Sequence, residues 1–261
     1  MRILITNDDG IRARGLWTLA EHLKEVGEVV VVAPDREQSA ISSAITLHHP
    51  VRLAEVEPLI PGIKAYSVEG TPADSVILSL SMLYKGQVDL VFSGINEGVN
   101  LGDDVLLSGT VGGALQGYFQ GLPAVALSVE QGEDGLHFGT AARIGALLAE
   151  RLRSKRLKGG ILLNVNLPNL PLHEIKGIEV TRLARRSYID SIEEGHDGKR
   201  SYYWIVRGSP CWEMEEATDI WAIESKKISI TPLHRDLTDV SRRRFLKGLA
   251  TSLAADLTTL K

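Results

Sequence analysis

The sequence predicts an α/β protein with a Rossmann-like, mostly parallel sheet flanked by helices. Apolar runs of strand length recur through the first 170 residues, and they alternate with segments of helical periodicity. Runs that are apolar at every position are typical of strands buried on both faces, as in a parallel sheet that helices cover. This alternation therefore favours a doubly wound sheet.

The first βαβ unit is expected within the N-terminal 34 residues. Ile3 to Thr6 form a buried-strand pattern, and Gly15 to Val26 carry apolar residues at helical spacing. Gly27 stands where helices commonly end, and the valine-rich run from Glu28 to Pro34 reads as the second strand. Two strands and a helix in so short a stretch predict a parallel pair.

The remaining elements of the core follow the same alternation. Thr71 and Pro72 are typical of a helix cap and of the first helical position, so a helix is expected to open there. Further strands are expected at 51–56, 63–68, 88–93, 124–128 and 161–165, and further helices at 110–120 and 141–152.

The character of the chain changes after residue 171. Strands are expected at 177–182, 201–207 and 227–231, with a polar, turn-like segment at 193–200. An amphipathic helix over 237–257 closes the chain, and its expected buried face is Val240, Phe245, Leu246, Leu249 and Leu253. We therefore expect a catalytic core over residues 1–170 and a C-terminal appendage over residues 171–261.

Most of the tryptophan also lies in this C-terminal part, together with two tyrosines: Tyr202, Tyr203, Trp204, Trp212 and Trp221. Aromatic side chains on an extended hairpin are covered either by their own subunit or by another one.

Composition limits the possible partners and the compartment. The 261 residues carry a formal net charge of -4 and no long basic run, so no nucleic-acid polymer is expected as a partner. The single cysteine excludes an internal disulfide, and no apolar span or signal-peptide pattern appears. We expect a cytoplasmic protein with no membrane contact.

Polar residues end three of the expected strands. Asp8 and Asp9 follow the first strand, Ser39 follows the second, and Asn96 follows the strand that ends at Ser93. Adjacent carboxylates at such a tip repel each other unless they are protonated, solvated or bridged by a cation. These oxygen donors suit Mg²⁺, Mn²⁺ or Ca²⁺ rather than zinc. The alternative is an ordinary turn in which Asp8 caps a helix.

A glycine-rich segment offers an anion site. Ser108, Gly109 and Thr110 precede an expected helix, so hydroxyls and backbone N–H groups there can face an anion. The alternative is a hinge with Thr110 as the helix cap. The chain has no Walker A loop and no GxGxxG after the first strand, which argues against a dinucleotide-dependent dehydrogenase.

Five motifs together resemble the survival protein E (SurE) family. They are ITNDDG at 5–10, APDREQSA at 33–40, SGINEGVNLG at 93–102, SGTVGGALQG at 108–117 and SITPLHRDLT at 229–238. The resemblance implies a metal-dependent phosphomonoesterase for nucleoside 5′- and 3′-monophosphates, which in some members also acts on short polyphosphate. It further implies that a β-hairpin and the C-terminal helix are exchanged between subunits, giving a homodimer or homotetramer.

The resemblance also implies roles for individual residues. One divalent cation per subunit, Mg²⁺ or Mn²⁺ with Ca²⁺ as a further candidate, would be held by Asp8, Asp9, Ser39 and Asn96. Phosphate would be bound by Ser108, Gly109 and Thr110, with Asn7 beside them. His234 in the late motif is either a general acid or phosphate contact, or a histidine satisfied within a strand-end loop.

Our mechanistic hypothesis is attack by a metal-activated water, with Asp8, Asp9 and Asn96 as the catalytic residues. Asp8 or Asp9 would alternatively accept the proton of that water, and an aspartyl-phosphate route is the competing mechanism. The competing functions are an exopolyphosphatase, a broad acid phosphatase and, in another class, a metal-stabilised nucleotide-binding protein without turnover.

Overall fold

A computed structural model describes the chain except residues 133–134, 155–159, 213 and 260–261. The side chains of 154, 186–191, 207–212 and 259 also lie outside the described part, and the expectation for Trp212 falls there. The main sheet has nine strands in the order β3-β4-β2-β1-β5-β6-β7-β11-β8. Five neighbouring pairs from β4 to β7 run parallel, whereas β3 and β11 pair antiparallel with β4 and β7. The expected α/β fold is confirmed.

The strands of this sheet are β1 Arg2–Thr6, β2 Glu28–Pro34, β3 Leu53–Val56, β4 Lys64–Val68, β5 Leu90–Glu97, β6 Ala124–Val129, β7 Leu162–Leu167, β8 Ile178–Val180 and β11 Ile228–Leu233. The α-helices are α1 Arg14–Lys24, α2 Pro72–Leu78, α3 Gly109–Phe119, α4 Phe138–Ser154, α5 Asp219–Glu224 and α6 Arg243–Thr259. Short helical turns cover Ser79–Leu83, Gly102–Leu106, Leu172–Glu174 and Val240–Arg242.

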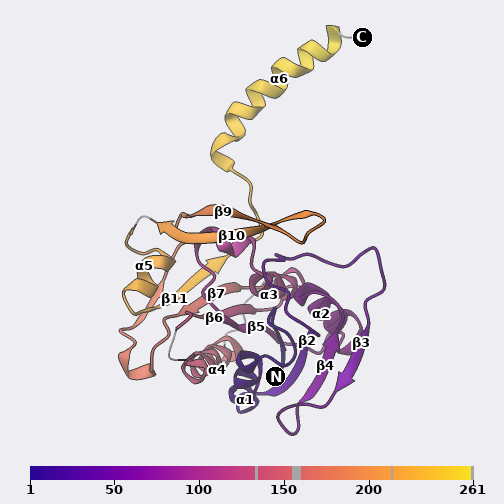
Figure 1. Cartoon of the computed structure of the whole chain (residues 1–261), viewed down its shortest axis with the longest axis vertical. Helices are drawn as coiled ribbons and strands as arrows, with labels where there is room; N and C mark the ends of the chain where they lie inside the picture. Colours follow the sequence, from indigo (N-terminus) through magenta and orange to yellow (C-terminus); the bar gives the residue numbers. More distant parts are fainter. Residues whose placement is uncertain (133–134, 155–159, 213, 260–261) are drawn as a thin grey trace.

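Helices cover both faces of the sheet (Figure 1), and β1 lies between β2 and β5 in its middle. Alternate residues of each buried strand point to opposite faces, so each face acquires its own core. On one face Ile3 and Ile5 pack with Leu16 of α1 and Ala141 of α4. On the other face Leu4 packs in a cluster that includes residues of α2 and α3. Both faces are thus closed, as the continuous apolar runs require.

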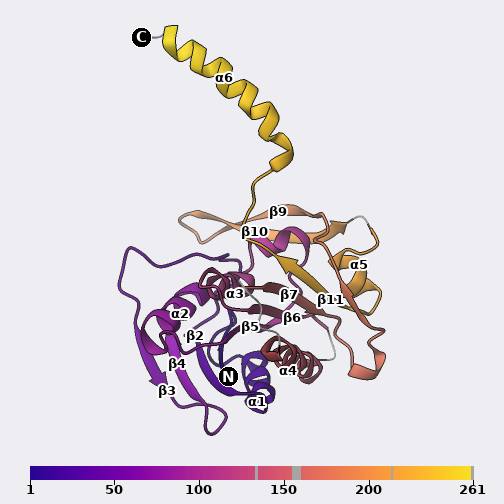
Figure 2. The same cartoon turned by 180° about the vertical axis from the view of Figure 1, so that it is seen from behind.

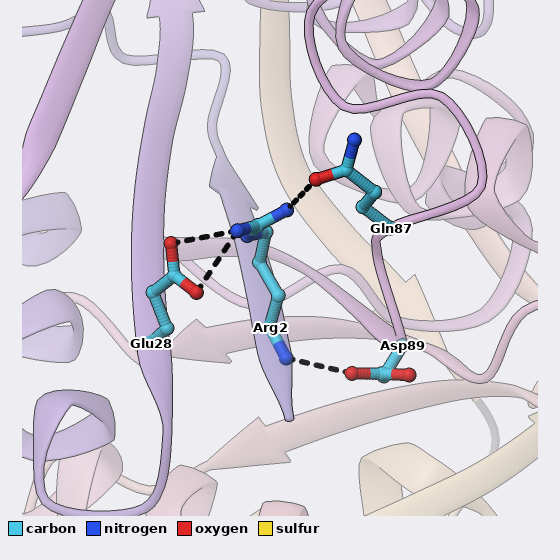
Figure 3. Close-up of polar contacts among 4 residues, drawn as sticks. All are labelled: Arg2, Glu28, Gln87 and Asp89. Atoms are coloured by element: carbon cyan, nitrogen blue, oxygen red, sulfur yellow. Dashed lines mark hydrogen bonds and ion pairs between the residues drawn. The ribbon is translucent and has the colours of Figure 1, made fainter.

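Arg2 ties three strands together at the end of β1 that is remote from its carboxyl tip (Figure 3). Its guanidinium donates to both carboxylate oxygens of Glu28 at 3.0 Å and to Gln87 Oε1 at 2.5 Å. Its backbone N–H donates to Asp89 Oδ2 at 2.7 Å, just before β5. The amino ends of β1, β2 and β5 are therefore fixed by one residue, which leaves the carboxyl ends for the site.

The C-terminal part adds strands to the sheet and a separate hairpin. β8 and β11 extend the main sheet across residue 171, while β9 (Arg186–His196) and β10 (Ser201–Trp212) form a two-stranded antiparallel sheet of their own. The turn-like segment expected from residue 193 is therefore strand as far as His196. The hairpin is exposed at Glu193 and Glu194 as well as at Trp204, so among its described side chains no inward and outward alternation marks residues 192–194 or 201–205.

The C-terminal helix α6 projects from the body of the molecule (Figures 1 and 2). α6 begins at Arg243 rather than at residue 237. The apolar face expected to be buried is exposed instead: Val240, in the short turn before α6, is 66% exposed, Phe245 is 74% exposed, and Leu246, Leu249 and Leu253 are 47–53% exposed. A single copy of the chain brings no described element against this face. Tyr203 and Trp204 of the hairpin are also mostly exposed. Among the described residues, no helix is long and apolar enough to cross a membrane.

Candidate metal and phosphate site

A cavity of about 790 Å³ opens beyond the carboxyl ends of the central strands. Asp8 and Asp9 reach it from the end of β1, Ser39 from the loop after β2, Asn96 from β5 and Ser108 from the start of α3. Ligand sites in open α/β sheets lie at this edge, because the strand order changes direction there. The structure thus brings five of the expected site residues to one cavity.

Asp8 is held in the wall of this cavity by contacts on both sides. The side chain is 4% exposed, and Thr110 Oγ1 donates a hydrogen bond to its Oδ1 at 2.5 Å. The backbone N–H of Gln38 donates to the carbonyl oxygen of Asp8 at 2.7 Å. Burial raises the pKa of Asp8, and the Thr110 hydrogen bond only partly offsets this effect.

Gly109 allows α3 to approach Asp8 closely. A Cβ at position 109 would lie 2.9 Å from Asp8 Cβ and 2.9 Å from the carbonyl oxygen of Gln38, which is closer than real Cβ contacts come. At Gly112 a Cβ would meet the carbonyl oxygen of Ser42 at 2.2 Å. These two glycines therefore bring the start of α3 against both the β1 tip and the loop that carries Ser39.

Asp9 lies beside Asp8 in a more open position. Burial, the neighbouring Asp8 carboxylate and then the Glu97 and Glu37 carboxylates raise the pKa of Asp9 to about 7. Its Oδ2 is buried without a hydrogen-bond partner among the described residues. A buried carboxylate oxygen of this kind gains from a cation, which supplies the charge that the surrounding groups lack.

Ser39 and Asn96 complete the set with neutral oxygens. Ser39 is exposed at the lining of the cavity, and its Oγ donates a hydrogen bond to Oε1 of Glu37, another lining residue, at 2.7 Å. Asn96 directs its Nδ2 to the carbonyl oxygen of Gly98 at 2.7 Å. No group of three or more His, Cys, Asp or Glu side chains able to hold a metal occurs in the described residues. A cation here therefore needs the hydroxyl and amide oxygens besides the two carboxylates.

The donor chemistry and the orphaned Asp9 oxygen together fit a hard divalent cation such as Mg²⁺, Mn²⁺ or Ca²⁺. The seven histidines add no ligand to the cavity lining, so the lining does not suit zinc.

Ser108 caps α3 at the edge of the cavity. Its Oγ accepts a hydrogen bond from the backbone N–H of Val111 at 3.1 Å, and the residue lines the cavity. Thr110, the other candidate for the cap, is fully buried and bonds to Asp8 instead. The amino end of α3, an eleven-residue helix, thus faces the cavity, and the positive end of the helix dipole lies there.

Four expected site residues lie outside the cavity lining that the structure describes: Asn7, Gly109, Thr110 and His234. Gly109 and Thr110 lie against Asp8 in the wall of the cavity. Asn7 is fully buried, and its Nδ2 donates to the carbonyl oxygen of Gly10 at 3.1 Å, so it shapes the turn after β1. His234 is exposed after β11, where its Nδ1 accepts from the backbone N–H of Asp236 at 3.2 Å. This contact agrees with a histidine satisfied in a strand-end loop, and a chemical role for His234 stays a prediction.

The cavity also contains polar residues that motif reasoning did not single out. Glu37, Glu97, Asp104, Glu130 and Asn100 line it besides the predicted residues. With Asp8 and Asp9 the described lining carries six carboxylates and no Lys, Arg or His. Glu37, Glu97 and Asn100 stand inside the quoted motifs, but Glu130 follows β6 with no local signal. An anion can enter such a cavity only with a cation or at the α3 amino end.

Comparison with known proteins places this geometry in a family. The family model described as Survival protein SurE matches residues 3–190. Proteins named 5′-nucleotidase SurE are similar over most of their length. One from Dehalococcoides mccartyi is 52% identical over 238 residues, covering 91% of this chain and 90% of that protein. The one from Moorella thermoacetica is 48% identical over 247 residues, covering 94% and 95%.

A solved structure agrees with the sequence matches. The crystal structure of the SurE protein from Aquifex aeolicus superposes with a TM-score of 0.81 at 37% sequence identity, covering 96% of this chain and all of that one. Family model, relatives and fold agree over the part of the chain that carries the cavity. The chain therefore belongs to the survival protein SurE family.

Proposed function

We propose that this chain is a divalent-metal-dependent phosphomonoesterase that hydrolyses nucleoside 5′- and 3′-monophosphates to nucleoside and phosphate. The observation that carries the proposal is one cavity in which four hard oxygen donors meet the amino end of α3. Relatives with 43–52% identity are named 5′-nucleotidase SurE, which supports the nucleotidase class.

Asp8, Asp9, Ser39 and Asn96 would hold one Mg²⁺ or Mn²⁺, with Ca²⁺ as a further candidate. A bound divalent cation would neutralise negative charge on the phosphate oxygens and lower the pKa of a bound water. The two carboxylates provide most of the negative charge for the ion, and Thr110 keeps Asp8 oriented toward the cavity through its hydrogen bond. Ser39 and Asn96 would contribute neutral oxygens, and because the two carboxylates already cancel the charge of the ion, the donors at the start of α3 must help to hold the phosphate.

Phosphate would be bound where α3 begins. The hydroxyl of Ser108 and the backbone N–H groups of Gly109 and Thr110 are the donors of this segment, and the helix dipole adds favourable potential. Since no cationic side chain lines the described cavity, these donors and the metal have to balance the phosphate charge together. Direct attack by water remains our preferred route over an aspartyl-phosphate.

The nucleoside would lie on the less polar part of the same cavity. Ala13, Ala40, Val99 and Leu107 line it, which provides an apolar surface beside the phosphate donors. None of these side chains presents a hydrogen-bonding group to a base. We therefore expect loose rather than strict base specificity.

Assembly into a homodimer or homotetramer is the second part of the proposal. The exposed apolar face of α6 and the exposed Tyr202, Tyr203 and Trp204 of the hairpin form surfaces that another copy would cover. Exchange of the hairpin and α6 between subunits accounts for a helix that contacts little of its own body. A catalytic core with a C-terminal appendage and a cytoplasmic location stay predictions.

A substrate panel tests the activity and separates it from its competitors. Phosphate release is measured from nucleoside 5′- and 3′-monophosphates, short polyphosphate and p-nitrophenyl phosphate, each with Mg²⁺, Mn²⁺ or a chelator. We expect metal-dependent release with the highest kcat/KM on nucleoside monophosphates. Preference for polyphosphate or for p-nitrophenyl phosphate would instead indicate an exopolyphosphatase or a broad phosphatase. Nucleotide binding without release would indicate a binding protein.

A further inference from the structure

A cluster of buried polar side chains is hydrogen-bonded to one wall of the cavity. The wall is the segment 97–107, which joins Asn96 to Ser108 and includes Gly98, Asn100 and Asp104 of the lining. Asn164 and Asn166 of β7 are completely buried, and Asn100 is 8% exposed. Buried amides are costly unless they are hydrogen-bonded, so such a cluster needs a structural or functional reason.

Asn166 pairs with the backbone of Asn100 through both ends of its side-chain amide. Its Oδ1 accepts from the backbone N–H of Asn100 at 2.8 Å, and its Nδ2 donates to the carbonyl oxygen of Asn100 at 3.1 Å. The side-chain amide of Asn166 thus satisfies the backbone N–H and C=O of Asn100, which lies beyond the end of β5 and has no neighbouring strand to pair with. Asn164 Nδ2 donates to the same carbonyl oxygen at 2.8 Å.

The wall is attached to the body at neighbouring points by other buried groups. Asn100 Nδ2 donates to Ser128 Oγ at 2.9 Å at the end of β6. The backbone N–H of Gly102 donates to Asp219 Oδ2 at 2.8 Å, and Asp219 also accepts from the backbone N–H of Ala184 at 2.9 Å. Side chains therefore satisfy the backbone here, where no strand is available.

We propose that Asn166 is a positioning residue that sets the distance between Asn96 and the phosphate donors at Ser108 by fixing the backbone of Asn100. This proposal rests on the proposed function, because it assigns the cation to Asn96 and phosphate to the start of α3. Asn100 lies between Asn96 and Ser108 along the chain. The two hydrogen bonds from the Asn166 amide hold the backbone of Asn100 in place, and they therefore restrict the position of Asn96 relative to Ser108. Asn166 itself is not among the residues that line the described cavity.

The test compares Asn166→Ala with a matched control on the adjacent strand. Thr231 of β11 is 2% exposed and bonds to Thr181 Oγ1 at 2.7 Å, so Thr231→Val also removes a buried polar group but does not touch the wall. Three quantities are measured for each protein: Mn²⁺ affinity by titration calorimetry, inhibition by inorganic phosphate, and kcat and KM for nucleoside monophosphates.

We expect Asn166→Ala to weaken Mn²⁺ binding and to lower kcat/KM by about tenfold or more, as loss of outer contacts to a metal site commonly does. Thr231→Val should leave both within about twofold at a similar loss of Tm. The kcat/KM of Asn166→Asp should be no higher than that of Asn166→Ala, because a carboxylate cannot donate to the Asn100 carbonyl oxygen. If Asn166→Ala and Thr231→Val lower Mn²⁺ affinity and kcat/KM by the same factor at the same Tm, the proposal is overturned.

A milder variant covers the case in which Asn166→Ala does not fold. Asn164→Ala removes one of the two donors to the Asn100 carbonyl oxygen but leaves the Asn166 pair, so a reduction in kcat/KM smaller than tenfold is expected. Hydrogen exchange of the Asn100 amide should accelerate in Asn166→Ala and stay slow in Asn164→Ala and in Asn166→Asp, which both keep an acceptor for the Asn100 N–H. Unchanged exchange in folded Asn166→Ala, or unchanged kcat/KM in folded Asn166→Asp, would refute the proposal. Mn²⁺ affinity and exchange are read without turnover, so failure of the nucleotidase proposal would be seen separately.

Discussion

Thr110 donates a hydrogen bond to Asp8 across 102 residues of sequence, joining the first turn of α3 to the tip of β1. This contact couples the two halves of the site, since the segment that would bind phosphate also orients a carboxylate that would bind the cation. Gly109 makes the approach possible, because a Cβ there would collide with Asp8. The SGT sequence therefore serves steric and polar requirements together.

Removal of the Thr110 hydroxyl should reduce activity without loss of the fold. Thr110→Val keeps the shape of the side chain but leaves Asp8 Oδ1 without its donor. A hydrogen bond to a charged group contributes about 1.5–3 kcal/mol, so kcat/KM should fall by roughly 10- to 100-fold. Thr110→Ser, which retains the hydroxyl, should stay close to the unmodified protein. Equal kcat/KM for the Val and Ser variants would show that the contact has no role.

A methyl group at position 109 should displace α3 from Asp8. Gly109→Ala is expected to lower both Tm and kcat/KM, because its Cβ would lie 2.9 Å from Asp8 Cβ and from Gln38 O. Gly139→Ala in α4 is the matched control, since nothing lies within 4 Å of a Cβ there. Ala is favoured over Gly inside a helix by about 0.5–1 kcal/mol, so this control should raise Tm slightly. An active Gly109→Ala protein with unchanged Tm would contradict the close approach.

The metal-free protein should lose stability as pH rises. Burial raises the pKa of Asp8, and that of Asp9 reaches about 7, whereas an unfolded aspartate has a pKa of about 3.9. The folded state therefore binds more protons than the unfolded state between about pH 4 and pH 7, so these carboxyls lower the free energy of unfolding across that window. A divalent cation should reverse the loss, most strongly above pH 7.

The measurement is Tm against pH in a chelator, compared with the Asp8→Asn, Asp9→Asn double variant. The difference in Tm, double variant minus unmodified protein, should grow from pH 5 to pH 8. A difference that stays constant would mean that the two carboxyls do not titrate in this range.

The exposed face of α6 should control assembly. A charge at Leu249 and Leu253 costs the isolated subunit little, because both side chains are about half exposed, but it would prevent another copy from covering them. We expect sedimentation to show a dimer or tetramer for the unmodified chain and a smaller species for Leu249→Asp, Leu253→Asp. Thr251→Asp places a charge on another side of the helix and should leave the assembly intact. A compact monomer of the unmodified chain would reject the proposal.

Much of the core could be predicted because buried parallel strands carry a strong local signal. Ile3 to Ile5 and Val29 to Pro34 are apolar throughout, and both runs lie in strands of the sheet. The polar residues that end these runs lie at the carboxyl edge by geometry alone, so Asp8, Asp9, Ser39 and Asn96 were expected together. Their shared cavity agrees with that expectation, although metal binding itself stays a prediction.

The supporting contacts could not be predicted in the same way. Asn166 looks like a residue at a strand end, and its pairing with Asn100 depends on which strands are neighbours in space. Asp219 likewise reads as the start of a short helix, while its partners lie at Gly102 and Ala184. Residues 192–194 of β9 are all exposed, so this described part of the strand has no burial pattern for the sequence to reveal. Contacts of this kind depend on tertiary structure rather than on local propensity.

The most direct test of the account is phosphate release from a nucleoside monophosphate by the Asp8→Asn, Asp9→Asn protein, run beside the unmodified protein with Mg²⁺ or Mn²⁺. Both substitutions keep the side-chain size, and they remove the charges that would hold the cation. We predict metal-dependent release by the unmodified protein and loss of at least about a thousandfold in the folded variant, since metal and water activation are lost together. Release that persists in the variant, or that is unaffected by a chelator in the unmodified protein, would contradict a metal-dependent site at the tip of β1.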